Sequence, residues 1–194
     1  RREEERVRQE VLAAFTRRRE ELNQAAAHLA VLDATQARVL FGRAAGGILL
    51  RPGSGDRLRL LGARHPLLVG SLASLRGECL GEVGNTGDVV PLDFDPPAAV
   101  RAVLLSGPNA GGKTVALKTV GLTVLMAQAG IPVLVEDGSA LPEFSRLWCH
   151  IGDAQNLLSD LSTFSAAMCA TARLLQVADE NTLVLYDELG SGTD

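Results

Sequence analysis

The sequence predicts an α/β fold preceded by a long helix and a glycine-rich β region. Three observations along the 194 residues predict this arrangement. Residues 1–40 contain neither glycine nor proline, and residues 41–99 hold 11 of the 20 glycines. From residue 100 onward, short apolar runs alternate with helical stretches. We therefore expect three zones, at residues 1–40, 41–99 and 100–194.

The first zone has the apolar spacing of a helix. Apolar residues recur at intervals of four and three, interrupted at Arg18, namely Val11, Phe15, Leu22, Ala25, Leu29 and Leu32. The mixed charges stop at Glu21, after which alanine, leucine and valine dominate. We expect one long helix that leaves solvent and enters a packed body; an ordinary surface helix is the alternative.

The second zone has the composition of loop-rich β-structure. Its glycines accompany short alternating runs, such as residues 56–60. Turn-forming residues cluster at positions 52–55 and 84–87. We expect short strands joined by turns, without a long helix.

The third zone predicts a sheet with helices between its strands. Strands are expected at residues 102–106, 133–135, 146–151 and 183–186. One helix is expected over residues 115–129, ending at Gly130, and a second from about Ser162.

The segment between the first expected strand and helix fits the phosphate-binding pattern G-x-x-x-x-G-K-[ST]. Its residues are Gly107, Pro108, Asn109, Ala110, Gly111, Gly112, Lys113 and Thr114. The glycines allow backbone N–H groups to converge on phosphate oxygens, and the helix N-terminus adds the positive end of its dipole. We expect Lys113 to reach the β- and γ-phosphates of ATP, and the Thr114 hydroxyl to hold Mg²⁺.

Two acids follow the last expected strand. Asp187 and Glu188 come directly after four apolar residues, which is how a parallel strand delivers carboxylates to the sheet edge where ligands bind. We expect Asp187 to bind Mg²⁺ through a water shared with Thr114, and Glu188 to accept a proton from an attacking water. A base in that place favours an ATPase over a phosphotransferase.

A third candidate site is the start of the second helix. Ser162 is suited to an N-cap, and Ser162 and Thr163 could present hydrogen-bond donors to an anion. In ATPases that close as dimers, a helix start of this kind contacts the γ-phosphate bound by the partner subunit. A plain capped helix is the alternative.

Composition limits the class of protein. The first 21 residues carry seven arginines and six glutamates, and the rest of the chain is acidic, so no basic stripe for nucleic acid is expected here. No apolar run approaches the roughly 20 residues of a membrane span. The three cysteines show no C-x-x-C spacing. We expect a cytoplasmic protein without membrane contact.

Taken together, these motifs resemble the ATPase domain of the MutS family. The match rests on residues 64–68, on the loop Gly-Pro-Asn-x-Gly-Gly-Lys, on the helix start at residues 162–164 and on residues 187–193. Lys113-Thr114-Val115 and the final Gly-Thr-Asp resemble the second branch of the family, MutS-two. One departure is that residues 89–90, Val-Val, stand near where family members often stack adenine on an aromatic side chain.

The resemblance implies a P-loop NTPase sheet of the ATP-binding-cassette kind, incomplete at the C-terminus. It implies ATP and Mg²⁺ as cofactors and a homodimer in the full-length protein. It also implies DNA repair and recombination functions: binding of branched or duplex DNA through other regions, suppression of homologous recombination, and a nuclease module. In some bacteria this branch is linked to ribosome rescue, so ribosome or rRNA binding is a further expectation. Residues 1–40 would end a lever helix, and residues 1–194 alone would hydrolyse ATP weakly.

Two other classes stay open. An ATP-binding-cassette transporter or chromosome-structure ATPase needs a Leu-Ser-Gly-Gly-Gln signature, and residues 161–165 lack its glycines. A nucleotide-gated scaffold would bind ATP without turnover.

Overall fold

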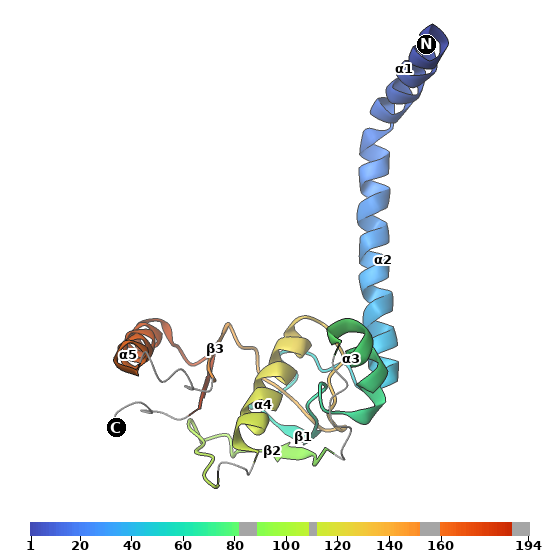
Figure 1. The fold of residues 1–194 in the computed structure, drawn as a ribbon. Coiled ribbons are helices and arrows are strands. Elements are labelled where there is room, and N and C mark those ends of the chain that lie inside the picture. The colour runs from blue at the N-terminus through green and yellow to red at the C-terminus, as the bar shows by residue number, and fades with distance from the viewer. Residues whose placement is uncertain (82–88, 109–111, 152–159, 188–194) are drawn as a thin grey trace. The chain divides into compact units, whose positions relative to one another are not determined.

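The computed structural model describes residues 1–81, 89–108, 112–151 and 160–187, except for the side chains of residues 160–167. The chain divides into two compact units, Arg1–Phe41 and Gly42–Asp194. Figure 1 shows the order of the helices and strands along the chain. No helix in the described ranges is long and apolar enough to cross a membrane.

The first unit contains two helices where one was predicted. Helix α1 spans Arg2–Arg17, and helix α2 spans Arg19–Ala45, the last residues of which belong to the second unit. Arg18 separates them with φ −105° and ψ 12°, outside the helical range. The Arg18 N–H is shared between the carbonyls of Ala14 and Phe15, at 3.3 and 3.2 Å, as is common at helix ends. The break therefore falls at the residue that interrupts the apolar spacing.

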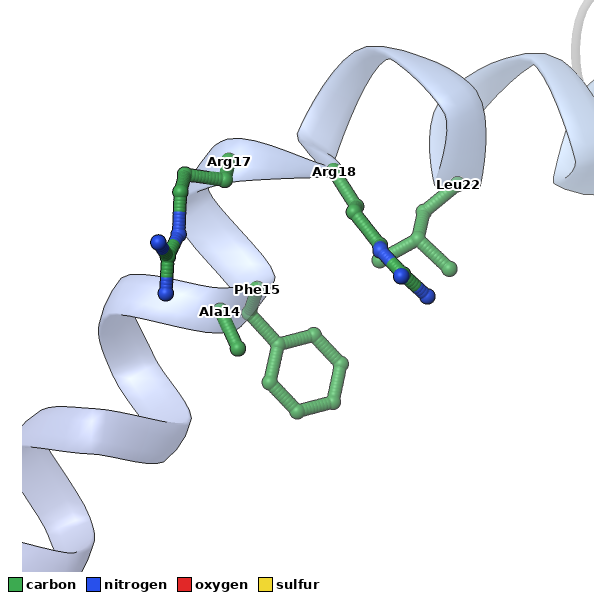
Figure 2. A pocket seen from close by; sticks show the side chains of 5 residues that line it. All are labelled: Ala14, Phe15, Arg17, Arg18 and Leu22. Atoms are coloured by element: carbon green, nitrogen blue, oxygen red, sulfur yellow. The ribbon is translucent and has the colours of Figure 1, made fainter.

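Packing does not hold these two helices in one line. Helix α1 has no buried residue, and the first buried residues of α2 are Gly42 and Ala45. The hollow at the break is lined by Ala14, Phe15, Arg17, Arg18 and Leu22 (Figure 2). Since no side chain around Arg18 is buried, the local backbone preference decides where α1 ends.

The second unit is mixed α/β, with two small sheets among the described residues. Strands β1, Leu60–Ala63, and β2, Leu92–Phe94, pair antiparallel. Strands β3, Arg146–His150, and β4, Thr182–Tyr186, pair parallel, in register from Arg146 opposite Thr182 to His150 opposite Tyr186. The strands predicted at residues 146–151 and 183–186 are thus confirmed.

The other two predicted strands are absent from the described structure. Residues 101–106 form no strand, and Leu104 is 90% exposed, because no described segment supplies them with a hydrogen-bonded partner. Residues 133–135 are buried, but their backbone bonds go to different neighbours. Val133 exchanges hydrogen bonds with Ile48, whereas the Leu134 carbonyl accepts one from Arg64. A single bridge forms there instead of a strand.

The glycine-rich zone contains helical structure that the sequence analysis missed. A 3₁₀ turn, η1, spans Gly70–Leu72 and leads into helix α3, Ala73–Leu80. Helix α3 ends at Gly81, which is left-handed with φ 68°. A glycine directly after an alanine- and leucine-containing segment is the usual signal for a helix end, and it could have identified α3.

Helix α4, Lys113–Gln128, lies at the centre of the second unit and confirms the helix predicted after the phosphate-binding pattern. It begins after left-handed Gly112, and Gly130, with φ 67°, follows its end. Helix α4 contacts both β1 and β4. The largest fully buried side chains among the described residues are those of Leu60, Val124, Val133, Leu134 and Leu141, which form an aliphatic core.

Helix α4 approaches β4 closely at Gly121. A Cβ atom added there would lie 2.6 Å from Cδ1 of Leu185, a side chain that is only 5% exposed. The absence of a side chain at Gly121 therefore lets α4 approach β4 at Leu185. This contact holds the start of α4 near the end of β4.

We predict that Gly121→Val lowers the free energy of unfolding by about 2 kcal/mol, because the added methyl groups overpack the contact with Leu185. Gly77→Val is the matched control. Gly77 also lies inside a helix, but a Cβ atom there meets nothing within 4 Å. Its change should stay within about 0.5 kcal/mol. Denaturant unfolding measures both, and equal effects would show that the close approach is unimportant.

Candidate nucleotide-binding site

The structure describes both ends of the phosphate-binding loop. Gly107 and Pro108 lie at one end, and Gly112 leads into α4 at the other; Asn109, Ala110 and Gly111 lie outside the described residues. Gly107 has φ 151° and Gly112 has φ 77°. Side chains rarely adopt such angles, and nothing lies within 4 Å of a Cβ at either position. Backbone conformation, and not crowding, therefore requires these two glycines.

Lys113 connects the two described ends of the loop. It is the first residue of α4, and its ammonium group donates a hydrogen bond to the carbonyl oxygen of Gly107. The lysine head group therefore lies next to Gly107, at the first end of the loop. Its contact with a phosphate stays a prediction.

Thr114 and Asp187 form the central contact of the site. The Thr114 hydroxyl donates to Oδ2 of Asp187 at 2.6 Å, between residues 73 positions apart in the sequence. A hydroxyl donor and a carboxylate acceptor make a short, charge-assisted bond of this length. The sequence predicted that Asp187 binds Mg²⁺ through a water shared with Thr114, and the direct contact brings the same two groups together. The end of β4 and the start of α4 are thus brought together.

The pairing of β3 and β4 sets the position of Asp187. The Asp187 N–H donates to the carbonyl oxygen of His150 at 2.9 Å, which extends the parallel ladder one residue beyond the strand. Successive side chains of a strand point to opposite faces. Leu185 and Asp187 therefore share the face that meets α4, and Tyr186 points to the other.

The oxygen atoms of this pair are of the type that Mg²⁺ prefers. Hydroxyl and carboxylate oxygens suit a small hard cation, which usually keeps waters and binds substrate phosphates besides one or two protein groups. Across the described residues, no cluster of three or more histidine, cysteine, aspartate or glutamate side chains could hold a metal. The donor set therefore fits a cation shared with a phosphate better than an all-protein metal centre.

The start of the second helix differs from its prediction. Helix α5 spans Asp160–Val177, so Ser162 and Thr163 lie inside its first turns and the N-cap position predicted for Ser162 is wrong. Residues 152–159, directly before Asp160, lie outside the described residues.

The second acid, Glu188, lies outside the described residues, as do residues 190–194. Of the three residues predicted to converge on a triphosphate, the structure describes Lys113 and Asp187, and their convergence stays a prediction. Both belong to elements that meet at one end of the β3–β4 sheet.

His65 is the histidine of the Arg-His-Pro stretch at residues 64–66, upstream of the loop. It is half-buried in a loop, and burial, with a smaller effect of the Lys118 charge, lowers its pKa below the usual value. Its Nδ1 accepts the N–H of Leu67 at 3.3 Å. The neutral imidazole is therefore the favoured form.

The sequence analysis missed a cluster next to Asp187. The Tyr186 hydroxyl lies 3.2 Å from Oγ1 of Thr171, and the Tyr186 ring lies 4.7 Å from that of His150. The signal that could have indicated it is the placement of a phenol directly before the predicted metal-binding acid.

Comparison with known proteins shows which family this part of the chain is similar to. Residues 103–194, which include the loop and the acidic strand end, match the family MutS domain V. Endonuclease MutS2 of Maridesulfovibrio salexigens is 42% identical over 162 residues, 84% of this chain. The same-named proteins of Streptococcus suis and Thermotoga neapolitana are each 37% identical, over 84% and 86% of the chain.

The chain belongs to the MutS family. Its relatives place it in the MutS2 branch, as the motifs around Lys113 and at residues 192–194 predicted. The chain spans 19 to 20% of the length of these three relatives. The aligned segment exceeds the family match, so the MutS2 likeness extends upstream of residue 103.

We predict that Thr114 and Asp187 are energetically coupled in the absence of nucleotide. In a double-mutant cycle of Thr114→Val and Asp187→Ala, the free energy of unfolding should show an interaction of about 1–2 kcal/mol, as for a hydrogen bond to a charged group. Thr119→Val is the control, because the Thr119 hydroxyl bonds to Val115 in the same helix. Coupling of Thr119 to Asp187 as large as that of Thr114 would contradict the site geometry.

Proposed function

We propose that this chain is the ATP-binding and ATP-hydrolysing domain of a MutS2-type DNA-processing protein. The observation that carries the proposal is the hydrogen bond between Thr114 and Asp187. It unites the end of a phosphate-binding loop with a carboxylate at the end of a parallel strand. Phosphate loop and acid at one sheet edge are the two halves of a P-loop NTPase site.

ATP would bind by its phosphates. The backbone N–H groups of Gly107, Gly112 and the first turn of α4 would surround the phosphate oxygens, as the conformations of the two glycines permit. Lys113 would exchange its contact with the Gly107 carbonyl for the β- and γ-phosphates. In that exchange the ammonium group gives up one neutral acceptor and gains two charged ones, which favours the bound state.

Thr114 and Asp187 would hold Mg²⁺ at the same place. Bound there, the ion supplies positive charge against the charge that develops on the phosphate oxygens. The two side chains already lie together, so little rearrangement is needed to present their oxygens. With the ion bound, the Thr114 hydroxyl would direct its proton away from Asp187 and its oxygen toward the ion.

Hydrolysis would be assisted by Glu188. The adjacent acid, on the residue after Asp187, would accept a proton from the water that attacks the γ-phosphorus. The products are ADP and inorganic phosphate, and the proton leaves by way of the Glu188 carboxylate. A base beside the Mg²⁺ carboxylate is what separates an ATPase from a phosphotransferase here.

Residues Ser162 and Thr163 would complete the site of a second subunit. In a homodimer, the first turn of α5 would approach the γ-phosphate bound by the partner, and its unpaired backbone N–H groups suit an anion. ATP binding would then favour dimer closure. A chain of 194 residues alone would accordingly turn over ATP slowly.

The wider activities belong to the full-length protein. The matched relatives carry the name endonuclease. We propose that the full-length protein is cytoplasmic and makes no membrane contact. It would act in DNA repair and recombination, bind branched or duplex DNA, suppress homologous recombination and carry a nuclease module. A role in ribosome rescue through rRNA binding is part of the same proposal, by likeness to this branch alone.

Lys113→Ala should weaken ATP binding by about 10- to 100-fold, since it removes a charged hydrogen bond to phosphate. Calorimetry on the full-length protein measures the dissociation constant. Lys118→Ala is the control, a lysine on the same helix that should leave binding within twofold. Unchanged affinity in Lys113→Ala would refute the phosphate-binding role of the loop.

Glu188→Gln should lower kcat by about 100-fold or more, the contribution of a positioned base, with little change in ATP affinity. Phosphate release from the full-length protein measures the rate. Glu180→Gln, on an exposed turn before β4, is the matched control and should behave as wild type. Wild-type turnover in Glu188→Gln would show that another group is the base. A wild-type protein that binds ATP without turnover would favour the scaffold alternative.

A further inference from the structure

The face of β4 that points away from α4 carries a polar link to helix α5. Leu185 faces α4, where it meets Gly121, and Asp187 meets Thr114 on that side. Because side chains alternate along a strand, Tyr186 points to the opposite face. There its hydroxyl lies 3.2 Å from Oγ1 of Thr171, in the middle of α5.

The ring of Tyr186 is held separately from its hydroxyl. His150 is its register partner on β3, and the two ring centroids are 4.7 Å apart with planes tilted by 36°. The His150 carbonyl also accepts the N–H of Asp187. Replacement of Tyr186 by phenylalanine would keep the ring contact with His150 and remove the hydrogen bond to Thr171.

This link connects the two parts of the proposed site, the acidic end of β4 and helix α5. Asp187 is the next residue after Tyr186 and is bonded to Thr114. Thr171 belongs to the helix whose first turns contain Ser162 and Thr163. A rigid helix transmits displacement along its axis, and eight residues separate Thr163 from Thr171, about 12 Å at the usual rise. A movement at the start of α5 therefore reaches Tyr186, and through the backbone reaches Asp187.

We propose that Tyr186 is a positioning residue for ATP hydrolysis, which ties the start of α5 to the Mg²⁺-binding carboxylate through its hydrogen bond to Thr171. The inference rests on the proposed ATPase function. The phenol touches neither nucleotide nor metal; it fixes where Asp187 lies relative to α5. Loss of the link leaves the phosphate loop and Lys113 unchanged.

The test uses the full-length protein with the variants Tyr186→Phe, Thr171→Val and both together. Each single variant should lower kcat by about three- to tenfold and raise the MgCl₂ concentration for half-maximal turnover several-fold. ATP affinity measured without Mg²⁺ should stay within twofold, because Lys113 and the loop are untouched. A hydroxyl that only stabilised the fold would lower the melting temperature without moving the Mg²⁺ dependence.

The double variant tests the link itself. If the two hydroxyls act through one bond, the double variant is no slower than the slower single one. Thr171→Ser keeps the hydroxyl and should restore kcat and the Mg²⁺ dependence, even where Thr171→Val perturbs packing. Leu175→Ala, at a 76% exposed position on the same helix, is the control and should match wild type.

The outcomes separate this inference from the function on which it rests. If the wild-type protein does not hydrolyse ATP, the proposed function fails. If the wild type is active and Tyr186→Phe has the same kcat and the same Mg²⁺ dependence as the wild type, only the positioning role of Tyr186 is overturned. Independent effects that multiply in the double variant would also overturn it.

Discussion

One hydrogen bond constrains the end of the second unit that carries the phosphate-binding pattern. The Thr114 hydroxyl and the Asp187 carboxylate lie 2.6 Å apart only if the start of α4 and the end of β4 meet. Gly121 permits the close helix–strand approach, and the ladder to His150 extends β4 far enough to deliver the acid. The site is therefore a product of backbone packing, in which a small residue and a parallel register matter as much as the polar groups.

The parts of the fold that follow from local chemistry were predictable. The glycine pattern fixed the loop and the start of α4, and the apolar runs before Asp187 and at residues 146–151 gave the parallel pair. Each of these signals is contained in a few adjacent residues. The nearness of Thr114 to Asp187 follows from two such signals taken together, the loop pattern and the acid after an apolar run.

What the sequence did not predict depends on distant partners. Residues 133–135 are as apolar as a strand, yet their backbone bonds divide between Ile48 and the segment after β1. The Tyr186–Thr171 contact joins a strand to a helix, so no local pattern predicts it. Tertiary pairing, and not propensity, decided both.

The segment before the phosphate loop has a practical consequence for handling this domain. Val103 is 48% exposed and Leu104 is 90% exposed, in an apolar stretch with no backbone ladder among the described residues. Unpaired, β-prone and uncharged peptide is a template for intermolecular strand addition. A preparation of residues 1–194 at high concentration would therefore self-associate through this segment, and charged solubility partners or dilute conditions would keep it monodisperse.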